Sequence, residues 1–274
     1  MQQTILITGS TDGIGLETAK TLVSLGHKVL VHGRNRSKLE RARATLSELP
    51  GEGRVESFAA DLSILSEVEA LAKMVVNRNA SLDVLINNAG VYKSPEPITT
   101  DGLDVRFVVN TIAPFLLTKR LLPLLGRTGR VVNLSSAAQA AVDPKALAGK
   151  VRLRDSAAYA QSKLALTMWS RYMALSFQEQ SLKEQGPAII AVNPGSLLGT
   201  KMVKQAFGVA GGDIRIGAEI LRRAALAEEF AAASGQYFDN DSGRFASPHP
   251  DALDPEKSHE IVSTIEKVLA ELNQ

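Results

Sequence analysis

The hydrophobic positions of this chain form short apolar runs that alternate with longer segments in which apolar residues recur at helical spacing. The runs predict strands at residues 5–8, 29–33, 55–59, 82–86, 130–134, 187–192 and 235–238. They lack the alternation of apolar and polar positions that marks a half-exposed strand, and such continuity is typical of parallel strands covered on both faces. The pattern therefore predicts an α/β fold, in which residues 1–274 form a single domain with one doubly wound parallel sheet and helices on both faces.

Helical periodicity fills the intervals between the predicted strands. The expected helices cover residues 15–25, 37–49, 66–78, 103–125, 214–230 and 255–272, and a further helix includes residues 159–175. Ser63 is a candidate cap for the helix at 66–78, and Pro114 is expected to bend the helix at 103–125. Residues 196–212 mix apolar side chains with glycines, which suggests a mobile substrate loop or, alternatively, a buried connecting helix.

Composition narrows the function classes. The chain has 274 residues, of which 45% are hydrophobic, and 31 basic and 29 acidic side chains leave a net charge of +2. That charge is too small to suggest a nucleic-acid partner. The absence of cysteine excludes disulfides and cysteine-ligated zinc, and we expect no metal site. No leader pattern and no apolar run of ~18 residues is found, so we expect a cytoplasmic protein without a membrane partner.

A glycine-rich turn follows the first predicted strand. Gly9, Gly13 and Gly15 have the spacing G-x-x-x-G-x-G and lead into a helix. The free N–H groups at a helix N-terminus, together with the helix dipole, attract anions such as phosphate. An ordinary glycine turn is the alternative, but the position at the first strand–helix junction favours a phosphate site.

The end of the second predicted strand indicates which dinucleotide could bind. An acidic side chain at this position would bind the 2′-hydroxyl of NAD, whereas this chain has Gly33, Arg34 and Arg36. Guanidinium groups suit a 2′-phosphate, so NADP(H) is preferred and NAD(H) is possible.

Tyr159 and Lys163 are four residues apart in a helical segment, so both side chains lie on one face of the helix. An ammonium beside a phenol favours the phenolate and is expected to lower the pKa of the tyrosine. For an isolated pair, a core tyrosine beside a solvated lysine is the alternative. The accompanying motifs favour acid/base chemistry.

These motifs occur in one order along the chain: Thr8-Gly9-x-x-x-Gly13-x-Gly15, Asn87-Asn88-Ala89-Gly90, Asn110, Ser136, Tyr159-x-x-x-Lys163 and Asn193-Pro194-Gly195. With them the chain resembles the short-chain dehydrogenase/reductases from Thr4 to at least Thr200. The resemblance implies a Rossmann fold that binds NAD(P) and an oxidoreductase that moves hydride between nicotinamide and a carbonyl/alcohol pair.

The resemblance also implies roles for individual residues. Ser136 is hydrogen-bonded to the substrate oxygen, with Ser135 as the alternative, and Tyr159 is the general acid/base. Lys163 binds the nicotinamide ribose, and Asn110 holds a water linked to Lys163. The implied cofactor-binding residues are Gly9, Ser10, Thr11, Gly13, Ile14, Gly15, Arg34, Arg36, Asp61, Leu62, Asn87, Ala89, Gly90, Tyr159, Lys163, Pro194, Gly195 and Thr200.

Some positions depart from the family pattern. Asp12 precedes the second glycine, where NADP-preferring members often have a basic residue. The interval of 159 − 136 = 23 positions between Ser136 and Tyr159 is longer than usual and, with Gly235-Gln-Tyr-Phe and Ser247-Pro248, resembles the retinol-dehydrogenase-type branch. The loop after Pro194-Gly195 has one extra residue before Thr200.

We therefore expect an NADP(H)-dependent oxidoreductase acting on a small carbonyl or alcohol. The pocket residues suggested by sequence are Val91, Tyr92, Leu197, Leu198, Met202 and Phe207, which favour an apolar substrate. A catalytically silent dinucleotide sensor or scaffold is the alternative. The helices at 116–125 and 164–175 carry more apolar residues than one core-facing stripe requires, so a homodimer through them is expected.

Overall fold

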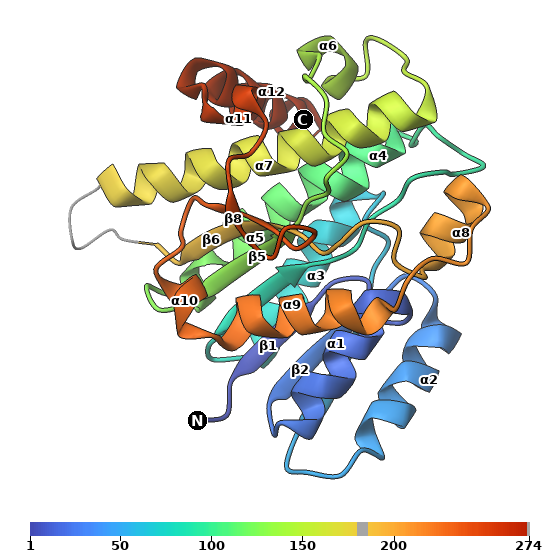
Figure 1. Ribbon diagram of the computed structural model, residues 1–274, viewed down its shortest axis with the longest axis vertical. Helices are drawn as coiled ribbons and strands as arrows, with labels where there is room; N and C mark the ends of the chain where they lie inside the picture. The colour runs from blue at the N-terminus through green and yellow to red at the C-terminus, as the bar shows by residue number, and fades with distance from the viewer. Residues whose placement is uncertain (180–185, 273–274) are drawn as a thin grey trace.

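An eight-stranded sheet forms the centre of the computed structural model, which describes residues 1–179 and 186–272 (Figure 1). The strands are β1 Thr4–Ile7, β2 Lys28–Gly33, β3 Arg54–Ala59, β4 Val84–Asn87, β5 Arg130–Leu134, β6 Ala188–Asn193, β7 Tyr237–Asp239 and β8 Arg244–Ala246. Their order is β3-β2-β1-β4-β5-β6-β7-β8, and all neighbours are parallel except β7 and β8. The predicted doubly wound sheet is confirmed, with β8 as an additional antiparallel edge strand.

The strand order reverses direction between β1 and β4, which are hydrogen-bonded neighbours. The chain winds outward from β1 through β2 to β3, and then from β4 through β5 to β7. Loops that leave β1 and β4 therefore separate to opposite faces of the sheet and open a crevice at the carboxyl ends of the strands. This switch point locates the binding cleft.

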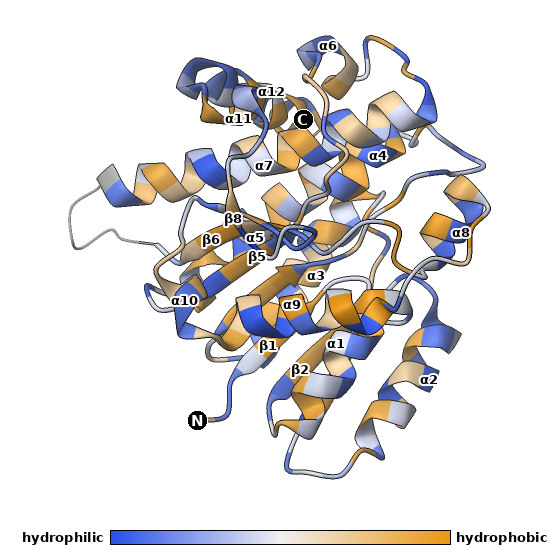
Figure 2. Cartoon of the chain, viewed as in Figure 1, coloured by the Kyte–Doolittle hydropathy of each residue, from blue (hydrophilic) through white to orange (hydrophobic). Residues whose placement is uncertain are grey.

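Helices cover both faces of the sheet. They are α1 Gly13–Ser24, α2 Arg36–Ser47, α3 Leu65–Arg78, α4 Val105–Phe107, the π-helix η1 Val108–Ile112, α5 Ala113–Leu125, α6 Pro144–Leu147, α7 Asp155–Glu179, α8 Lys201–Phe207, α9 Ile214–Leu226, α10 Glu228–Ala231, α11 Pro250–Leu253 and α12 Pro255–Leu272. Because side chains alternate along a strand, Ile5 and Ile7 of β1 pack with α1, α2 and α9, whereas Leu6 packs with α3, α5 and α7. In Figure 2 the strands are mostly hydrophobic in colour, and the helices carry both hydrophobic and hydrophilic residues.

The helix expected at 103–125 is divided into three parts. The π-helical turn η1 separates α4 from α5, and Asn110 lies inside this turn. Pro114 lies in the first turn of α5, where a missing N–H is tolerated, so the interruption comes before the proline rather than at it.

The predicted cap on the helix at 66–78 is wrong. α3 begins at Leu65, and its N-cap residue is Ile64, which has no capping side chain. The Ser63 hydroxyl instead donates to the carboxylate of Asp61, at 2.7 Å. A carboxylate beside the serine is the stronger acceptor and holds its hydroxyl away from the helix.

The surplus of apolar residues on α5 and α7 is buried within the chain. Leu121 and Trp169 belong to one core cluster with Ile261 and Ile265 of α12, which packs along α7. No large hydrophobic side chain on α5 or the described part of α7 is exposed. The apolar residues from which a homodimer was expected are therefore covered within the chain, and they give the homodimer no support. The expectation of no apolar run long enough to cross a membrane is wrong for Val105–Leu125, which is long and apolar enough, although 67% of its most apolar window is buried in the protein.

Candidate active site

A cleft of about 900 Å³ opens at the carboxyl ends of the central strands. Most residues expected to bind cofactor or substrate line it: Gly9, Thr11, Gly13, Ile14, Gly15, Arg34, Asp61, Leu62, Ala89, Gly90, Ser136, Tyr159, Lys163, Pro194, Gly195 and Thr200. Four expected residues, Ser10, Arg36, Asn87 and Asn110, are not among its lining residues. Asn88, His32 and Leu134 line it and were missed by sequence reasoning.

Glycine is required at three positions of the turn between β1 and α1, which are Gly9, Gly13 and Gly15. Gly9 and Gly13 have φ of +64° and +55°, a region that favours glycine. A Cβ on Gly15 would lie 2.4 Å from Asn88 Nδ2 and 2.6 Å from the Gly9 carbonyl oxygen. The backbone at the N-terminus of α1 is thus held in a close turn, packed against Asn88 and the Gly9 carbonyl.

Asn88 holds this turn against the end of β4. Its amide donates to the carbonyl oxygens of Thr8 and Gly9, at 2.9 and 3.0 Å. The neighbouring Asn87 points the other way, into the core, where it donates to Thr118 and Asn133. The alternation of side chains at a strand end separates the two amides, and the sequence assigned the cleft to the wrong member of the pair.

His32 and Ser10 are buried, and their hydrogen bonds hold the glycine turn in place. Nδ1 of His32 accepts a hydrogen bond from the Gly9 N–H at 3.1 Å, so Nε2 carries the proton and donates to the Ala60 carbonyl at 3.0 Å. Burial lowers the pKa of His32 to about 4 and keeps the ring neutral. The Ser10 hydroxyl donates to Ile7 and accepts from the His32 N–H. The only sequence signal for this role is a polar residue within an apolar strand.

The adenosine end of the cleft carries opposite charges. Arg34 is 75% exposed, and its guanidinium lies 3.9 Å from the carboxylate of Asp61. Arg36 is the first residue of α2 and lies outside the cleft. A Cβ on Gly33 would lie 2.5 Å from Thr11 Cγ2, so the glycine allows the two loops to pack closely. Of the two arginines in the sequence motif, only Arg34 is placed to meet a ligand in the cleft.

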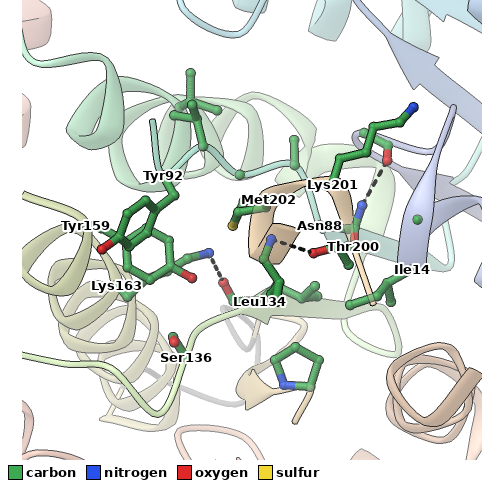
Figure 3. Close-up of a pocket in the computed structure, with 18 of the residues that line it drawn as sticks. Ile14, Asn88, Tyr92, Leu134, Ser136, Tyr159, Lys163, Thr200, Lys201 and Met202 are labelled. Carbon is green, nitrogen blue, oxygen red and sulfur yellow. Dashed lines mark hydrogen bonds between the residues drawn. The ribbon is translucent and has the colours of Figure 1, made fainter. Parts of the chain in front are cut away.

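Tyr159 and Lys163 project from α7 toward Ser136, which follows β5 (Figure 3). Burial raises the pKa of the Tyr159 phenol and outweighs the Ser136 hydroxyl, which acts in the opposite direction. The Lys163 ammonium lies 5.8 Å from the centre of the Tyr159 ring and donates to the Leu134 carbonyl at 2.6 Å. Burial lowers the pKa of Lys163 to about 8. The expected lowering of the tyrosine pKa is therefore not found, because desolvation dominates at both groups.

The two adjacent serines differ in what their hydroxyls contact. Ser135 is buried, and its hydroxyl pairs with Thr167 at 2.7 Å and donates to the Lys163 carbonyl at 3.3 Å. Ser136 is partly exposed, and its hydroxyl accepts from the Ala138 N–H at 3.1 Å. The Ser136 hydroxyl is also the one that acts on the Tyr159 phenol, where it favours a lower pKa.

Asn110 connects the loop after β4 to α7. Its side-chain oxygen accepts from the Val91 N–H at 2.8 Å, and its amide donates to the Val91 carbonyl and to the Ser162 hydroxyl. Both amide hydrogens are therefore used within the protein, and only the oxygen can accept a further bond. The side chain stiffens the site next to Lys163 and does not line the cleft.

The loop after β6 is anchored by hydrogen bonds to Asn240 and Asp241, which follow β7. The Asp241 carboxylate accepts from the Ser196 N–H and hydroxyl, and Asn240 donates to the Pro194 carbonyl. Thr200 caps α8 by accepting from the Val203 N–H. No residue of α8 is buried, which argues against the buried connecting helix considered for residues 196–212.

The substrate side of the cleft is apolar and aromatic. The Tyr92 ring lies 4.9 Å from the Tyr159 ring and 5.6 Å from the Phe207 ring, centroid to centroid. Val91, Val105, Val109, Leu198, Met202 and Val203 line the same cleft. Tyr159 and Ser136 therefore present two hydroxyls to a space whose other walls are mainly hydrocarbon.

Comparison with known proteins identifies the family. The model of the short chain dehydrogenase family matches residues 3–208. Retinol dehydrogenase 13 of Mus musculus is 32% identical over 278 residues, which cover 94% of this chain and 81% of that protein. Polyprenol dehydrogenase of Homo sapiens is 34% identical over 212 residues, covering 74% of this chain and 62% of that protein. A short-chain dehydrogenase of Shigella flexneri 2a, solved with NADP, is 27% identical with a TM-score of 0.66, covering 87% of this chain and 97% of that one.

The chain therefore belongs to the short-chain dehydrogenase/reductase family. It is an NAD(P)-dependent oxidoreductase, and the predicted resemblance to the retinol-dehydrogenase-type branch is confirmed. The cleft fits a dinucleotide on its own geometry, since Gly9, Gly13 and Gly15 line it at the N-terminus of α1, where backbone N–H groups attract phosphates. Arg34 and Lys163 supply positive charge at two positions along this cleft.

Proposed function

We propose that this protein uses NADP(H) to interconvert an apolar alcohol and its aldehyde or ketone, with Tyr159 as the general acid/base. The observation that carries the proposal is that Tyr159 and Ser136 line the same cleft as the glycine turn and the apolar side chains. When bound in the cleft, nicotinamide would supply the hydride to, or accept it from, the substrate carbon. The protein supplies position and a proton donor.

In carbonyl reduction the Ser136 hydroxyl donates a hydrogen bond to the substrate oxygen, and the Tyr159 phenol gives that oxygen its proton. The raised pKa of Tyr159 supports this direction, because the phenol is protonated at neutral pH. In alcohol oxidation the same phenol must first lose its proton, so oxidation requires a higher pH. Lys163, held by the Leu134 carbonyl, places its positive charge beside the phenol and stabilises the phenolate as it forms.

The preference for NADP(H) over NAD(H) rests on Arg34. At Gly33 there is no acidic side chain to bind a 2′-hydroxyl, and the exposed guanidinium of Arg34 can leave its 3.9 Å contact with Asp61 to bind a 2′-phosphate. Asp61 opposes this preference because its carboxylate lies within 4 Å of Arg34. The solved Shigella relative contains NADP, which supports the same choice.

The apolar walls near Tyr92 and Phe207 favour a hydrophobic substrate. Retinol dehydrogenase and polyprenol dehydrogenase are named for lipid alcohols. We therefore propose a hydrophobic alcohol or carbonyl compound, with residues 196–212 as the substrate loop. A cytoplasmic location, a homodimer and the absence of a membrane partner remain predictions.

Oxidation of NADPH, measured against a panel of aldehydes and ketones of increasing hydrocarbon length, tests the proposal. We expect turnover that rises with apolar surface and is lost in Tyr159→Phe, whose fold and cofactor affinity are unchanged. Cofactor binding without turnover of any substrate would favour the dinucleotide sensor. The sensor explains the fold and glycine turn, but gives no chemical reason for Ser136, Tyr159 and Lys163 to meet.

A further inference from the structure

Asp12 places a carboxylate at the N-terminus of α1, within the glycine turn. Its side chain accepts from the Gly13 N–H at 2.9 Å and caps the helix, and it lines the cleft with 48% exposure. A phosphate attracted to the N–H groups of this helix end would meet that negative charge at close range. The glycine turn therefore contains a negatively charged carboxylate, which repels the phosphate that the backbone N–H groups of the turn attract.

Lys201 neutralises Asp12 from a distant part of the chain. Its ammonium forms an ion pair with the Asp12 carboxylate, although the two residues are 189 positions apart. Lys201 is the first residue of α8, and the preceding Thr200 would lie 3.7 Å from a Cβ on Gly13. Figure 3 shows Lys201 on the same side of the cleft as Thr200 and Ile14, away from Tyr159. The substrate loop thus supplies a cation to the cofactor half of the cleft.

The charges around Asp12 fit this function. Burial raises the pKa of Asp12, but the hydrogen bonds from Lys201 and the Gly13 N–H outweigh it, so the carboxylate is ionised at neutral pH. Lys38 of α2 acts on Asp12 in the same direction at longer range. Arg34 is engaged with Asp61, so it cannot also neutralise Asp12 without leaving that contact.

We propose that Lys201 is a cofactor-affinity residue, which cancels the charge of Asp12 and so allows the phosphate groups of a nicotinamide dinucleotide to bind at a turn that carries a carboxylate. The proposal rests on the NADP(H) function proposed above and deepens it. It also explains how this chain tolerates an acid where NADP-preferring relatives often have a base: the missing positive charge comes from α8. Cofactor affinity is consequently coupled to the position of the substrate loop.

Isothermal titration with NADPH and NADH, on Lys201→Met and on the matched control Lys204→Met, tests the proposal. Lys204 lies one turn further along the same short helix and does not line the cleft. We expect Lys201→Met to weaken NADPH about tenfold, because an uncompensated charge a few ångströms from a phosphate acts over this range. NADH carries less charge and should lose less, Lys204→Met should change little, and the loss should shrink in high salt.

The double variant D12N/K201M identifies the target of Lys201. Asparagine is also a good helix cap, so the double variant keeps α1 intact while removing both charges. We expect it to bind NADPH about as tightly as the wild type. Equal affinities of the Lys201→Met and Lys204→Met variants, or a double variant as weak as Lys201→Met alone, would overturn the proposal. A wild-type protein that binds neither cofactor would overturn the proposed function as well.

Discussion

The guanidinium of Arg106 donates to the carboxylate of Asp155, which begins α7 four positions before Tyr159. Arg106 is almost fully buried, and its other side donates to Asp104 at 2.8 and 2.6 Å. The start of the helix that carries the phenol is therefore held by a buried charge on a neighbouring segment.

A second connection follows Tyr159 in the same helix. Ser162 accepts from Asn110 at 2.9 Å through its hydroxyl and from Thr111 at 2.7 Å through its carbonyl. Tyr159 thus lies between two polar attachments to residues 104–111. We infer that these attachments set the position of the phenol relative to Ser136.

Asp155→Asn tests the first attachment. Arg106 keeps its bonds to Asp104, so the fold should persist, and we expect kcat to fall about tenfold because small displacements of a catalytic group reduce rate strongly. The cofactor dissociation constant should not change. Asp213→Asn is the control, since Asp213 also starts a helix and pairs with an arginine, but at the surface. If the two variants have the same kcat, the attachment does not position Tyr159.

Arg106→Met should be far more damaging to stability than to cofactor binding. It leaves the buried Asp104 carboxylate without its partner, and we expect the free energy of unfolding to fall by about 3–5 kcal/mol. Arg120→Met is the control, because Arg120 pairs with Glu69 at the surface and should contribute ~0–1 kcal/mol. Urea denaturation of the two variants measures both values, and a loss as small as that of Arg120→Met would contradict the buried ion pair.

Tyr159→Phe should lower turnover by ~10²–10⁴-fold, the range for losing a general acid, and should leave NADPH affinity intact. Steady-state kinetics with a substrate that the wild type reduces provides the measurement. Near wild-type kcat would refute the catalytic assignment.

Ser136→Ala should lower kcat, whereas Ser135→Ala should mainly affect stability, since the Ser135 hydroxyl contacts Thr167 and Lys163 in the interior. Kinetics and thermal unfolding of both variants separate these effects. The reverse ranking would make Ser135 the group that binds the substrate oxygen.

Lys163 should make stability depend on pH. Its folded-state pKa is lowered from 10.5 to about 8, so below pH 8 the fold holds a buried ammonium at a cost. Between pH 8 and 10.5 the unfolded chain binds more protons than the folded one, and stability must rise with pH through this window. Lys163→Met should therefore stabilise the protein at pH 7 by on the order of 1–3 kcal/mol, with a gain that shrinks toward pH 10.5. Thermal unfolding across this range checks it, and a gain independent of pH would contradict the buried charge.

Arg34→Ala should weaken NADPH about tenfold and NADH much less, because the guanidinium recognises only the 2′-phosphate. Arg36→Ala is the control, as Arg36 follows the same strand but lies outside the cleft. Titration with both cofactors decides between them. Equal losses for NADPH and NADH in Arg34→Ala would remove the basis for the NADP(H) preference.

The sequence predicted those features that depend on local pattern. Apolar runs located seven strands, and the spacing of Gly9, Gly13 and Gly15 placed a close turn at the correct end of the sheet, because both follow from neighbouring residues. β8 was missed because Arg244–Ala246 is too short for a pattern to be visible. The pairs Asn87 with Asn88 and Arg34 with Arg36 have similar chemistry, and only the direction of each side chain distinguishes them.

The remaining errors concern contacts between distant parts of the chain. The pairing of Asp12 with Lys201 spans 189 positions, and no local pattern encodes it. The lowered tyrosine pKa was expected from the presence of an ammonium, whereas the depth of burial at Tyr159 and Lys163 decides the direction of both shifts. The apolar surplus on α7 is covered by α12 of the same chain, so the homodimer stays a prediction that this surplus no longer supports.

The match to the family model ends at residue 208, but the sheet continues beyond it. Residues after 208 form β7, which pairs with the outer edge of β6, and its Tyr237 hydroxyl donates to the Ser136 carbonyl at 3.2 Å. They also form α9 and α12, which cover the two faces of the sheet. A fragment trimmed to the region of family similarity would therefore present β6 as a bare hydrophobic edge. Such an edge recruits strands from other molecules, so the fragment would aggregate instead of behaving as a minimal enzyme.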